Sequence, residues 1–577
     1  MKILFVHSNI NVRYGGFGEV PAMQLGIASI SALLKQHGHQ CELLLLQEQN
    51  WARAVHIVQQ LQPDLVAFTS VTTQFPYIAE LSRHLRRSNP RLFQICGGPH
   101  VTLVPESALS VAPLDAVCVG EGEYPMLELV ACLARSQCHS AIANLYVRAP
   151  DGSIAKNPPR PFIDDLDSLP FLDRALYQNA IDLPQYPHSI LTTRGCYFQC
   201  SYCCNHSFQN IATGRYVRSR SASNILNEIQ LLRQQYPALS SLYIEDEAIG
   251  LNAGLWEELL PALKDTGLHY GTNYRIGTTD VAFLDKLKAA NFVRVNIGIE
   301  SGNEWIRHHV LNRHYSNDMI VEVFAHARAI GLSTKSYNLI GLPHETPERF
   351  EDTIRINQVV HPDETALNMF YPYPQTQLDC LCDQLGIKGT PPSSPICERT
   401  ETILELPGFP HRVLMHYFKN WKTMIAQSPH LPLPIAKAQN MLPLYADLTA
   451  MELLERNCLS PQELLLEAYL ELVAKRLRSG HPKGFALYGW TPVAKMFMQM
   501  LSRLSLKPEL IFLDEEVIDP PKLKMDSILN LPHYELSSIV IADTTNHYEK
   551  LAFLKKSSNT TGIDIIDPFF RLPLLND

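Results

Sequence analysis

The first 140 residues alternate short apolar runs with segments whose apolar residues recur at helical spacing. Residues 25–34 show this helical spacing, and Gly38 provides a stop signal after them. Five runs are predicted to be strands, at residues 2–7, 40–46, 64–70, 92–96 and 116–120. The alternation predicts a doubly wound, Rossmann-like α/β domain over residues 1–140, in which ligands bind beside the carboxyl ends of parallel strands.

Four loops at that predicted edge are rich in glycine or hydroxyl side chains, and each follows a strand. Glycine permits a close approach of the backbone to a flat ligand. Each loop alone is typical of a tight turn, but four at one edge indicate a ligand site. A nicotinamide-binding loop would have the pattern Gly-x-Gly-x-x-Gly directly after the first strand. Here Gly16-Phe17-Gly18 is followed by Glu-Val-Pro, without the third glycine, which disfavours nicotinamide as the ligand. The candidate ligand-binding residues in these loops are Gly16, Ser70, Thr72, Thr73, Gly97, Gly98, Gly120, Glu121 and Gly122.

A second alternation covers residues 186–385, with strand-like runs at 189–193, 241–245, 270–275, 294–299, 333–340 and 364–370. Helical patterns separate these runs, which predicts a partial β/α (TIM-like) barrel with its active site at the carboxyl ends of the strands. Residues 141–185 lie between the two alternations. They contain a predicted hairpin around Asp151-Gly152 and then four prolines, which indicates a linker that packs between the domains.

The remaining third of the chain divides into two regions. Residues 386–480 are mostly helical in pattern and contain no chemical motif. Residues 481–577 return to alternation, with runs at 484–488, 509–514, 538–543 and 562–567, and predict a small Rossmann-like domain. The turn at 488–491 could bind a nucleotide or a carrier-linked substrate, but its single glycine does not establish such a site. The domain could instead close the barrel or mediate dimerisation.

Composition and charge exclude several classes of partner and indicate where the protein works. The 577 residues suggest about four domains, and 46% hydrophobic with 19% charged residues is a globular composition. A net charge of −9 disfavours nucleic acid and anionic membranes as partners. Because no apolar run reaches the ~20 residues of a membrane span and the start does not resemble a signal peptide, we expect a cytoplasmic protein. Its 13 cysteines are then reduced, available for metals rather than disulfides.

The most specific pattern is Cys196-x-x-x-Cys200-x-x-Cys203, directly after the first predicted barrel strand. Three thiolates can hold three irons of a cubane 4Fe–4S cluster and leave the fourth iron open for chemistry. A structural zinc site that adds His206 as the fourth ligand is the alternative.

The other cysteines give weaker signals. Cys204 adjoins Cys203, which makes simultaneous ligation of one ion strained, so it is interpreted as an incidental thiol. Cys380, Cys382 and Cys397 could hold a second cluster, but a Cys-x-Cys pair is more often two buried residues.

The cysteine motif resembles the radical S-adenosylmethionine (SAM) superfamily, and the sheet before the barrel resembles its cobalamin-binding branch. Tyr202 matches the aromatic residue that members commonly carry beside the last cysteine. The resemblance implies a 4Fe–4S cluster, SAM and cobalamin (methylcobalamin) as cofactors. It assigns Glu245, Asp246 and Glu247 to the methionine amino group of SAM. It assigns Glu300 and Ser301 to the ribose and carboxylate of SAM, and Ile340 and Gly341 to its adenine. Without the cysteines, these acids would be interpreted as solvated turns or strand-end charges.

The sequence departs from part of that family in one motif. Residues 1–140 lack the Asp-x-His-x-x-Gly that presents a lower-face histidine to cobalt in many methyltransferases and mutases. The lower ligand of cobalt is therefore open, and residues 70–74 are the candidate for its neighbourhood. His7 and His100 lie at strand ends, where a lone histidine is more often structural.

The resemblance implies radical chemistry, in which a deoxyadenosyl radical takes hydrogen from an unactivated carbon and methylcobalamin supplies a methyl group. We therefore predict a C-methyltransferase for a small-molecule or carrier-linked substrate, with an electron donor such as flavodoxin or ferredoxin. Ring formation or oxidative rearrangement with the same cofactors is the first alternative, and a non-catalytic corrinoid and iron–sulfur sensor is the second. The basic loop at 215–220 could grip an anionic group or be simply solvated.

Overall fold

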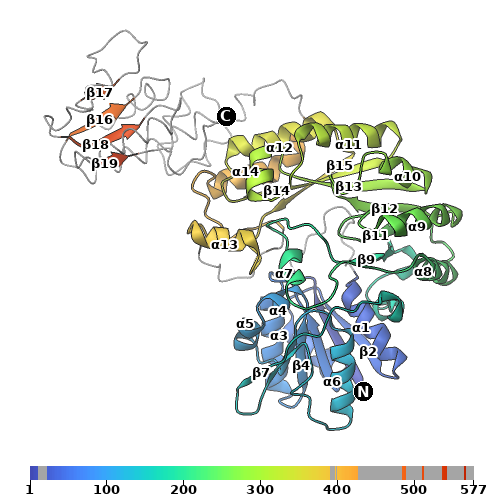
Figure 1. Cartoon of the computed structure of the whole chain (residues 1–577). Helices are drawn as coiled ribbons and strands as arrows, with labels where there is room; N and C mark the ends of the chain where they lie inside the picture. Colours follow the sequence, from blue (N-terminus) through green and yellow to red (C-terminus); the bar gives the residue numbers. More distant parts are fainter. Residues whose placement is uncertain are drawn as a thin grey trace. The chain divides into compact units, whose positions relative to one another are not determined.

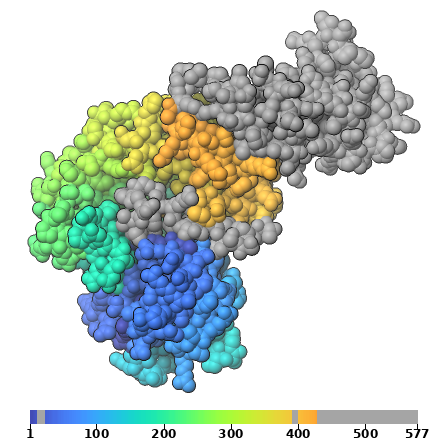
Figure 2. Space-filling view, turned by 180° about the vertical axis from the view of Figure 1, so that it is seen from behind, coloured from blue at the N-terminus to red at the C-terminus, as the bar shows by residue number. Residues whose placement is uncertain are grey.

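The computed structural model describes residues 1–10, 23–389, 397 and 399–426, together with the backbones of four strands nearer the C-terminus. These parts are coloured in Figures 1 and 2, apart from the last strands, which Figure 1 alone shows in colour. The chain divides into two compact units. One unit comprises residues 1–343 and 359–404, and the other comprises residues 344–358 and 405–577.

The first unit begins with a seven-stranded sheet in the order β2-β1-β3-β4-β5-β6-β7 (Figure 1). The first five strands in sequence are parallel, and the predicted hairpin, β6 with β7, extends the edge antiparallel to β5. The strands are β1 (Lys2–Ser8), β2 (Gln40–Leu46), β3 (Leu65–Thr69), β4 (Phe93–Gly97), β5 (Ala116–Cys118), β6 (Leu145–Arg148) and β7 (Ile154–Lys156).

Helices cover both faces of this sheet because alternate residues of a strand point to opposite sides. In β1, Ile3 and Phe5 join the core under α1 and α6, whereas Leu4 and Val6 join the core under α2, α3 and α5. The predicted doubly wound domain is thus confirmed. Its helices are α1 (Leu25–Gln36), α2 (Trp51–Leu61), α3 (Phe75–Ser88), α4 (Pro99–Leu103), α5 (Pro105–Val111) and α6 (Glu123–Ala134).

The connector at 157–188 contains three short 3-10 turns, η1 (Leu166–Ser168), η2 (Arg174–Tyr177) and η3 (Leu183–Gln185). It contacts both neighbours. Asp173 accepts a hydrogen bond from Ser31 of α1, and Arg174 forms a buried ion pair of 2.8 Å with Glu228 of the barrel helix α8.

The barrel contains six parallel strands in the order β15-β14-β13-β12-β11-β8, which confirms the partial β/α barrel. The strands are β8 (Ser189–Ile190), β11 (Ser241–Ile244), β12 (His269–Tyr274), β13 (Phe292–Glu300), β14 (Ser333–Ile340) and β15 (Glu364–Met369). The helices between them are α8 (Ala222–Gln235), α9 (Ala253–Asp265), α10 (Phe283–Ala289), α11 (Asn317–Ala329) and α12 (Pro347–Val360), with a π-helical turn, η4 (Ile306–Val310), before α11.

The predicted first barrel strand, 189–193, is interrupted. Only Ser189–Ile190 pairs with β11, while β9 (Thr193–Arg194) pairs antiparallel with β10 (Arg218–Ser219) as a separate ribbon. The buried carboxylate of Asp246 accepts hydrogen bonds from the backbone N–H groups of Thr192 and Thr193, at 2.7 and 3.1 Å. These bonds take the place of sheet pairing at this point.

The later elements are α7 (Asn205–Gln209) after the cysteines, then α13 (Gln377–Gln384) and α14 (His411–Ile425). Most of the region predicted to be helical, beyond residue 426, lies outside the described residues. The last four strands, β16 (Gly484–Tyr488), β17 (Leu510–Phe512), β18 (Leu536–Ile541) and β19 (Asp564–Ile566), are parallel in the order β17-β16-β18-β19. No helix in the described part of the chain is both long and apolar enough to cross a membrane.

Candidate functional site

The three motif cysteines lie on the loop that follows β9. Gly195, just before Cys196, has φ +89°, and an added Cβ would lie 2.4 Å from the carbonyl oxygen of Tyr216. Only glycine fits this turn, because the backbones of the cysteine loop and of residue 216 meet there. Cys196 and Cys200 are buried, and Cys203 is partly exposed.

The cysteines line a cavity of about 220 Å³, here called the cluster cavity, at the carboxyl ends of the barrel strands. Three of the residues assigned to SAM or its surroundings, Tyr202, Glu247 and Glu300, share this lining. The structure does not bring the other assigned residues to the cavity wall: Glu245, Asp246, Ser301, Ile340 and Gly341. Ser301 and Ile340 are fully buried, and the carboxylate of Asp246 binds backbone N–H groups instead of facing the cavity.

Glu300 is held by an arginine that the sequence did not single out. Arg313 Nη1 donates to Glu300 Oε1 at 2.8 Å and to the Tyr202 hydroxyl at 2.7 Å, and its Nη2 donates to the carbonyl of Gly298 at 3.0 Å. Burial raises the pKa of Glu300, and the charge of Arg313 opposes this shift. The three side chains connect the end of β13 to the cysteine loop.

A second arginine, Arg275 at the end of β12, also lines the cluster cavity. Its guanidinium lies 3.4 Å from the ring centroid of Phe198, which is between the first two cysteines, and its Nε has no hydrogen-bond partner. The cavity therefore has both a carboxylate and a guanidinium on its wall, and both can bind a zwitterionic amino-acid group.

The zinc alternative receives no support from His206. Its Nε2 accepts a hydrogen bond from the backbone N–H of Gln377 at 3.3 Å. Among the described residues, no group of three or more His, Cys, Asp or Glu side chains is placed to hold one metal ion.

Cys204 hydrogen-bonds to Cys203 and lowers the pKa of the Cys203 thiol to about 6. The cysteines proposed for a second cluster differ in burial: Cys380 is exposed, Cys382 is buried and Cys397 is intermediate.

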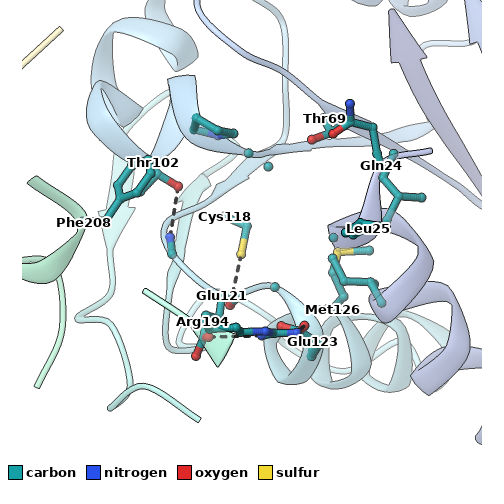
Figure 3. Close-up of a pocket in the computed structure, with 18 of the residues that line it drawn as sticks. Gln24, Leu25, Thr69, Thr102, Cys118, Glu121, Glu123, Met126, Arg194 and Phe208 are labelled. Carbon is teal, nitrogen blue, oxygen red and sulfur yellow. Dashed lines mark hydrogen bonds and ion pairs between the residues drawn. The ribbon is translucent and has the colours of Figure 1, made fainter. Parts of the chain in front are cut away.

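A larger cavity of about 420 Å³, here called the corrinoid cavity, lies at the carboxyl ends of β3, β4 and β5 (Figure 3). Apolar side chains form most of its wall, among them Leu25, Met126 and Phe208. Five of the predicted loop residues line it: Gly97, Gly98, Gly120, Glu121 and Gly122. Gly16 lies outside the described residues.

The loop at 70–74, proposed for the lower face of cobalt, is not among the residues that line the corrinoid cavity. The Ser70 hydroxyl donates to the carbonyl of Val71, Gln74 accepts from Ser8, and Thr73 is buried. The side chain of Ser70 thus bonds within the loop, and that of Gln74 bonds to β1.

Thr69 and Thr102 line the corrinoid cavity instead. Thr102 Oγ1 accepts from the N–H of Gly120 at 3.1 Å. Thr72 lies next to His100, with its Oγ1 3.3 Å from His100 Nδ1. Burial lowers the pKa of both His7 and His100 to about 4, and neither lines the cavity.

Glu247 lines both cavities, so the two spaces adjoin at this residue. Its side chain is open to the empty space, but the surrounding walls limit its hydration and raise its pKa to about 7. The structure thus brings together the loops after β4 and β5 of the first sheet, the cysteine loop and the carboxyl ends of the barrel strands.

The basic loop at 215–220 is not a free anion-binding surface. Arg215 pairs with Asp164, Arg218 with Glu121, and Arg220 with Glu228. The sequence could not show that each cation already has a carboxylate partner.

Comparison with known proteins agrees with this arrangement. Residues 19–130 match the family model of the B12 binding domain, and residues 190–356 match that of the radical SAM superfamily. The chain therefore carries the two domains that define the cobalamin-binding radical SAM enzymes. The resemblance inferred from the cysteine motif is confirmed, and so is the set of cofactors that these two domains imply: a 4Fe–4S cluster, SAM and cobalamin.

Two relatives and one solved structure are similar to this chain over more than two thirds of their own length. An uncharacterized methyltransferase of Pyrococcus horikoshii is 25% identical over 61% of this chain and 77% of its own length. An anaerobic magnesium-protoporphyrin IX monomethyl ester cyclase of Rubrivivax gelatinosus is 27% identical over 66% and 69%. The structure of the methyltransferase TsrM from Kitasatospora setae, with cobalamin and a 4Fe–4S cluster bound, covers 68% of this chain and 78% of its own at 18% identity and a TM-score of 0.52. At that identity, the likeness to TsrM shows the fold.

Proposed function

We propose that this enzyme is a cobalamin-dependent radical SAM C-methyltransferase that acts on an unactivated carbon of a small-molecule or carrier-linked substrate. The observation that carries the proposal is the position of Glu247 on the walls of both the corrinoid cavity and the cluster cavity. A carbon at this junction would be near both cofactors. The methyltransferase of P. horikoshii supports the choice of reaction.

The residues present fit the three cofactors. Cys196, Cys200 and Cys203 would hold the cluster, and Glu300 and Arg275 have the charges to bind SAM beside it. The open backbone at Gly97, where an added Cβ would have no neighbour nearer than 4.0 Å, leaves room for a corrin face. When bound, the cluster and SAM would supply a radical, and cobalamin would supply a methyl group.

The chain's own residues bind, orient and shield. The apolar side chains of the corrinoid cavity exclude water from a reactive site. Arg313 keeps Glu300 in one orientation, and Glu247 offers a carboxylate to a hydrogen-bond donor at the junction. We expect a flavodoxin or ferredoxin to deliver the electrons.

The direct test is anaerobic reconstitution followed by incubation with SAM and a reductant. Formation of methionine and 5′-deoxyadenosine would distinguish an enzyme from a sensor. A metabolite that lacks one methyl when the protein is deleted, and gains it when purified protein is added, would establish methyl transfer. If the added protein removes hydrogen from that metabolite without adding carbon, ring formation or oxidative rearrangement replaces the proposal. The similarity to the cyclase of R. gelatinosus is the observation that favours ring formation as the second candidate reaction.

The cluster assignment has its own test. Replacement of Cys196, Cys200 and Cys203 together by Ala should abolish iron binding after reconstitution, because too few thiolates remain. A matched triple replacement of Cys380, Cys382 and Cys397 should retain the iron and its visible absorption. Stoichiometric iron in the first variant would contradict the assignment.

A further inference from the structure

Two arginines of the β9–β10 ribbon, Arg194 and Arg218, form ion pairs with carboxylates in residues 119–123, a segment after β5 that is here called the corrinoid loop. Figure 3 labels Arg194, Glu121 and Glu123. Arg194 Nη1 lies 3.1 Å from Glu121 Oε1, and its Nη2 lies 2.7 Å from Glu123 Oε1. Glu123 is almost fully buried, and it also accepts a hydrogen bond from Ser29 of α1 at 2.8 Å. Burial opposes ionisation of Glu123, but the charge of Arg194, together with the hydrogen bonds from Arg194 and Ser29, outweighs burial and holds the pKa of the carboxyl below its usual value.

The second arginine strengthens the same contact. Arg218 Nη1 donates to both carboxylate oxygens of Glu121, at 2.9 and 3.0 Å, and to the carbonyl of Ile163 at 2.8 Å. Arg218 is the direct partner of Arg194 in the β9–β10 ribbon. Like charges opposite each other on paired strands repel, so the ribbon depends on Glu121 and Glu123 together to balance the two guanidinium charges.

The position of this network joins the two cofactor regions. Glu121 lies between the two cavity glycines, Gly120 and Gly122, and Arg194 lines the corrinoid cavity itself. Arg194 is also two residues before Cys196 in the chain. A buried charge that loses its partner is costly, so the corrinoid loop and the cysteine loop are held in one joint arrangement.

We propose that Arg194 is a positioning residue that couples cobalamin binding to loading of the iron–sulfur cluster. The inference rests on the cofactor assignment of the two cavities and not on methyl transfer. Each cofactor orders one of the two loops, and the ion pairs transmit that order to the other loop. Because coupling between binding sites is reciprocal, cobalamin binds more tightly when the cluster is present, and the cluster is retained better when cobalamin is present.

The test measures hydroxocobalamin affinity by anaerobic equilibrium dialysis of the full-length protein, with and without a reconstituted cluster. The ratio of the two dissociation constants is the coupling, and we expect roughly 5- to 150-fold in the wild type. Arg194→Gln should reduce the ratio to near one while iron content stays unchanged. Arg194→Lys should restore part of the ratio, because one ammonium can pair with only one of the two carboxylates at a time.

Arg174→Gln is the matched control. It also breaks a buried arginine–glutamate pair between chain segments, at 2.8 Å, but it touches neither the corrinoid loop nor the cysteine loop. Its coupling ratio should equal that of the wild type. If Arg194→Gln fails to fold, Glu123→Gln tests the same pair from the other side with little change in shape. A wild-type ratio of one, an unchanged ratio in the folded variant, or an equal fall in Arg174→Gln overturns the proposal.

Discussion

Two adjacent glycines at the end of β4 should respond in opposite ways to the addition of one methyl group. An added Cβ at Gly97 would have no neighbour nearer than 4.0 Å, at the Cβ of Cys118 and the carbonyl oxygen of Phe68. At Gly98, where φ is +95°, the same atom would lie 2.8 Å from Thr69 Oγ1 and 2.9 Å from the backbone of Ser70. Both glycines line the corrinoid cavity. Gly97→Ala therefore tests the cofactor wall, and Gly98→Ala tests the fold.

The magnitudes follow from these contacts. At Gly98, the backbone (φ +95°, ψ 179°) lies in a region that essentially only glycine adopts, which costs a residue with a side chain about 1–3 kcal/mol, and overpacking adds about 1–3 kcal/mol. Gly98→Ala should thus lower the free energy of unfolding by about 2–6 kcal/mol. Gly97→Ala should change it by less than about 0.5 kcal/mol. A methyl that intrudes on the corrin face should cost about 1–3 kcal/mol of binding, which is about 5- to 150-fold in affinity.

The assay combines urea unfolding with equilibrium dialysis of hydroxocobalamin on both variants and the wild type. The expected pattern is weak binding with normal stability for Gly97→Ala, and a lowered urea midpoint for Gly98→Ala. Unchanged affinity in Gly97→Ala would show that β4 does not face the corrin. Equal midpoints for the two variants would refute the steric argument.

Three further substitutions and two pH series distinguish residues that stabilise the fold from residues that bind ligand. Asp246→Ala should lower the urea midpoint by the equivalent of about 2–6 kcal/mol, because two buried backbone N–H groups lose their acceptor; a normal midpoint would contradict this role. Glu247→Gln should leave the midpoint unchanged and weaken SAM binding. In the wild type, SAM affinity should rise with pH through about 7, since the ionised carboxylate accepts the hydrogen bond, and calorimetry on the Gln variant should show a flat profile. His7 and His100 are neutral when folded, with pKa values lowered by burial from 6.5 to about 4, so stability should fall as pH falls from 6.5 towards 4, by about 2 kcal/mol for each at pH 5. His100→Gln should remove part of this acid sensitivity in urea midpoints measured at pH 7.5 and pH 5, and equal wild-type midpoints at the two pH values would show that the histidines titrate normally.

The sequence predicts the strands well where packing is regular. β14 occupies the predicted run 333–340 from end to end, because a strand between two neighbours in a parallel sheet needs an unbroken extended segment. The first barrel strand was predicted as one run but is divided into β8 and β9. The cause is the carboxylate of Asp246, which is 54 residues away in the chain, and no local pattern contains that contact.

The candidate site shows the same limit. The cysteine spacing is local, so the motif could be recognised directly. Glu245, Asp246 and Glu247 are consecutive acids with similar chemistry, and only the fold shows that Asp246 binds backbone and Glu247 faces both cavities. Arg313 was missed because its partner Tyr202 is 111 residues away.

The charged residues around the corrinoid cavity pair with one another, which leaves the corrin to be bound by other groups. Glu121 was predicted as a cofactor-binding residue, but both its oxygens accept hydrogen bonds from Arg218, and Oε1 is also paired with Arg194. Glu123 is similarly occupied. Since these carboxylates are neutralised within the protein, the corrin would be held mainly by backbone at the glycine loops and by apolar side chains. The ionised groups then serve a different purpose: they fix the corrinoid loop against the segment that leads into the first cysteine. Because the corrin would be held by uncharged groups, cobalamin affinity should depend little on ionic strength. The ion pairs that fix the corrinoid loop are buried, and salt screens buried pairs much less than exposed charges.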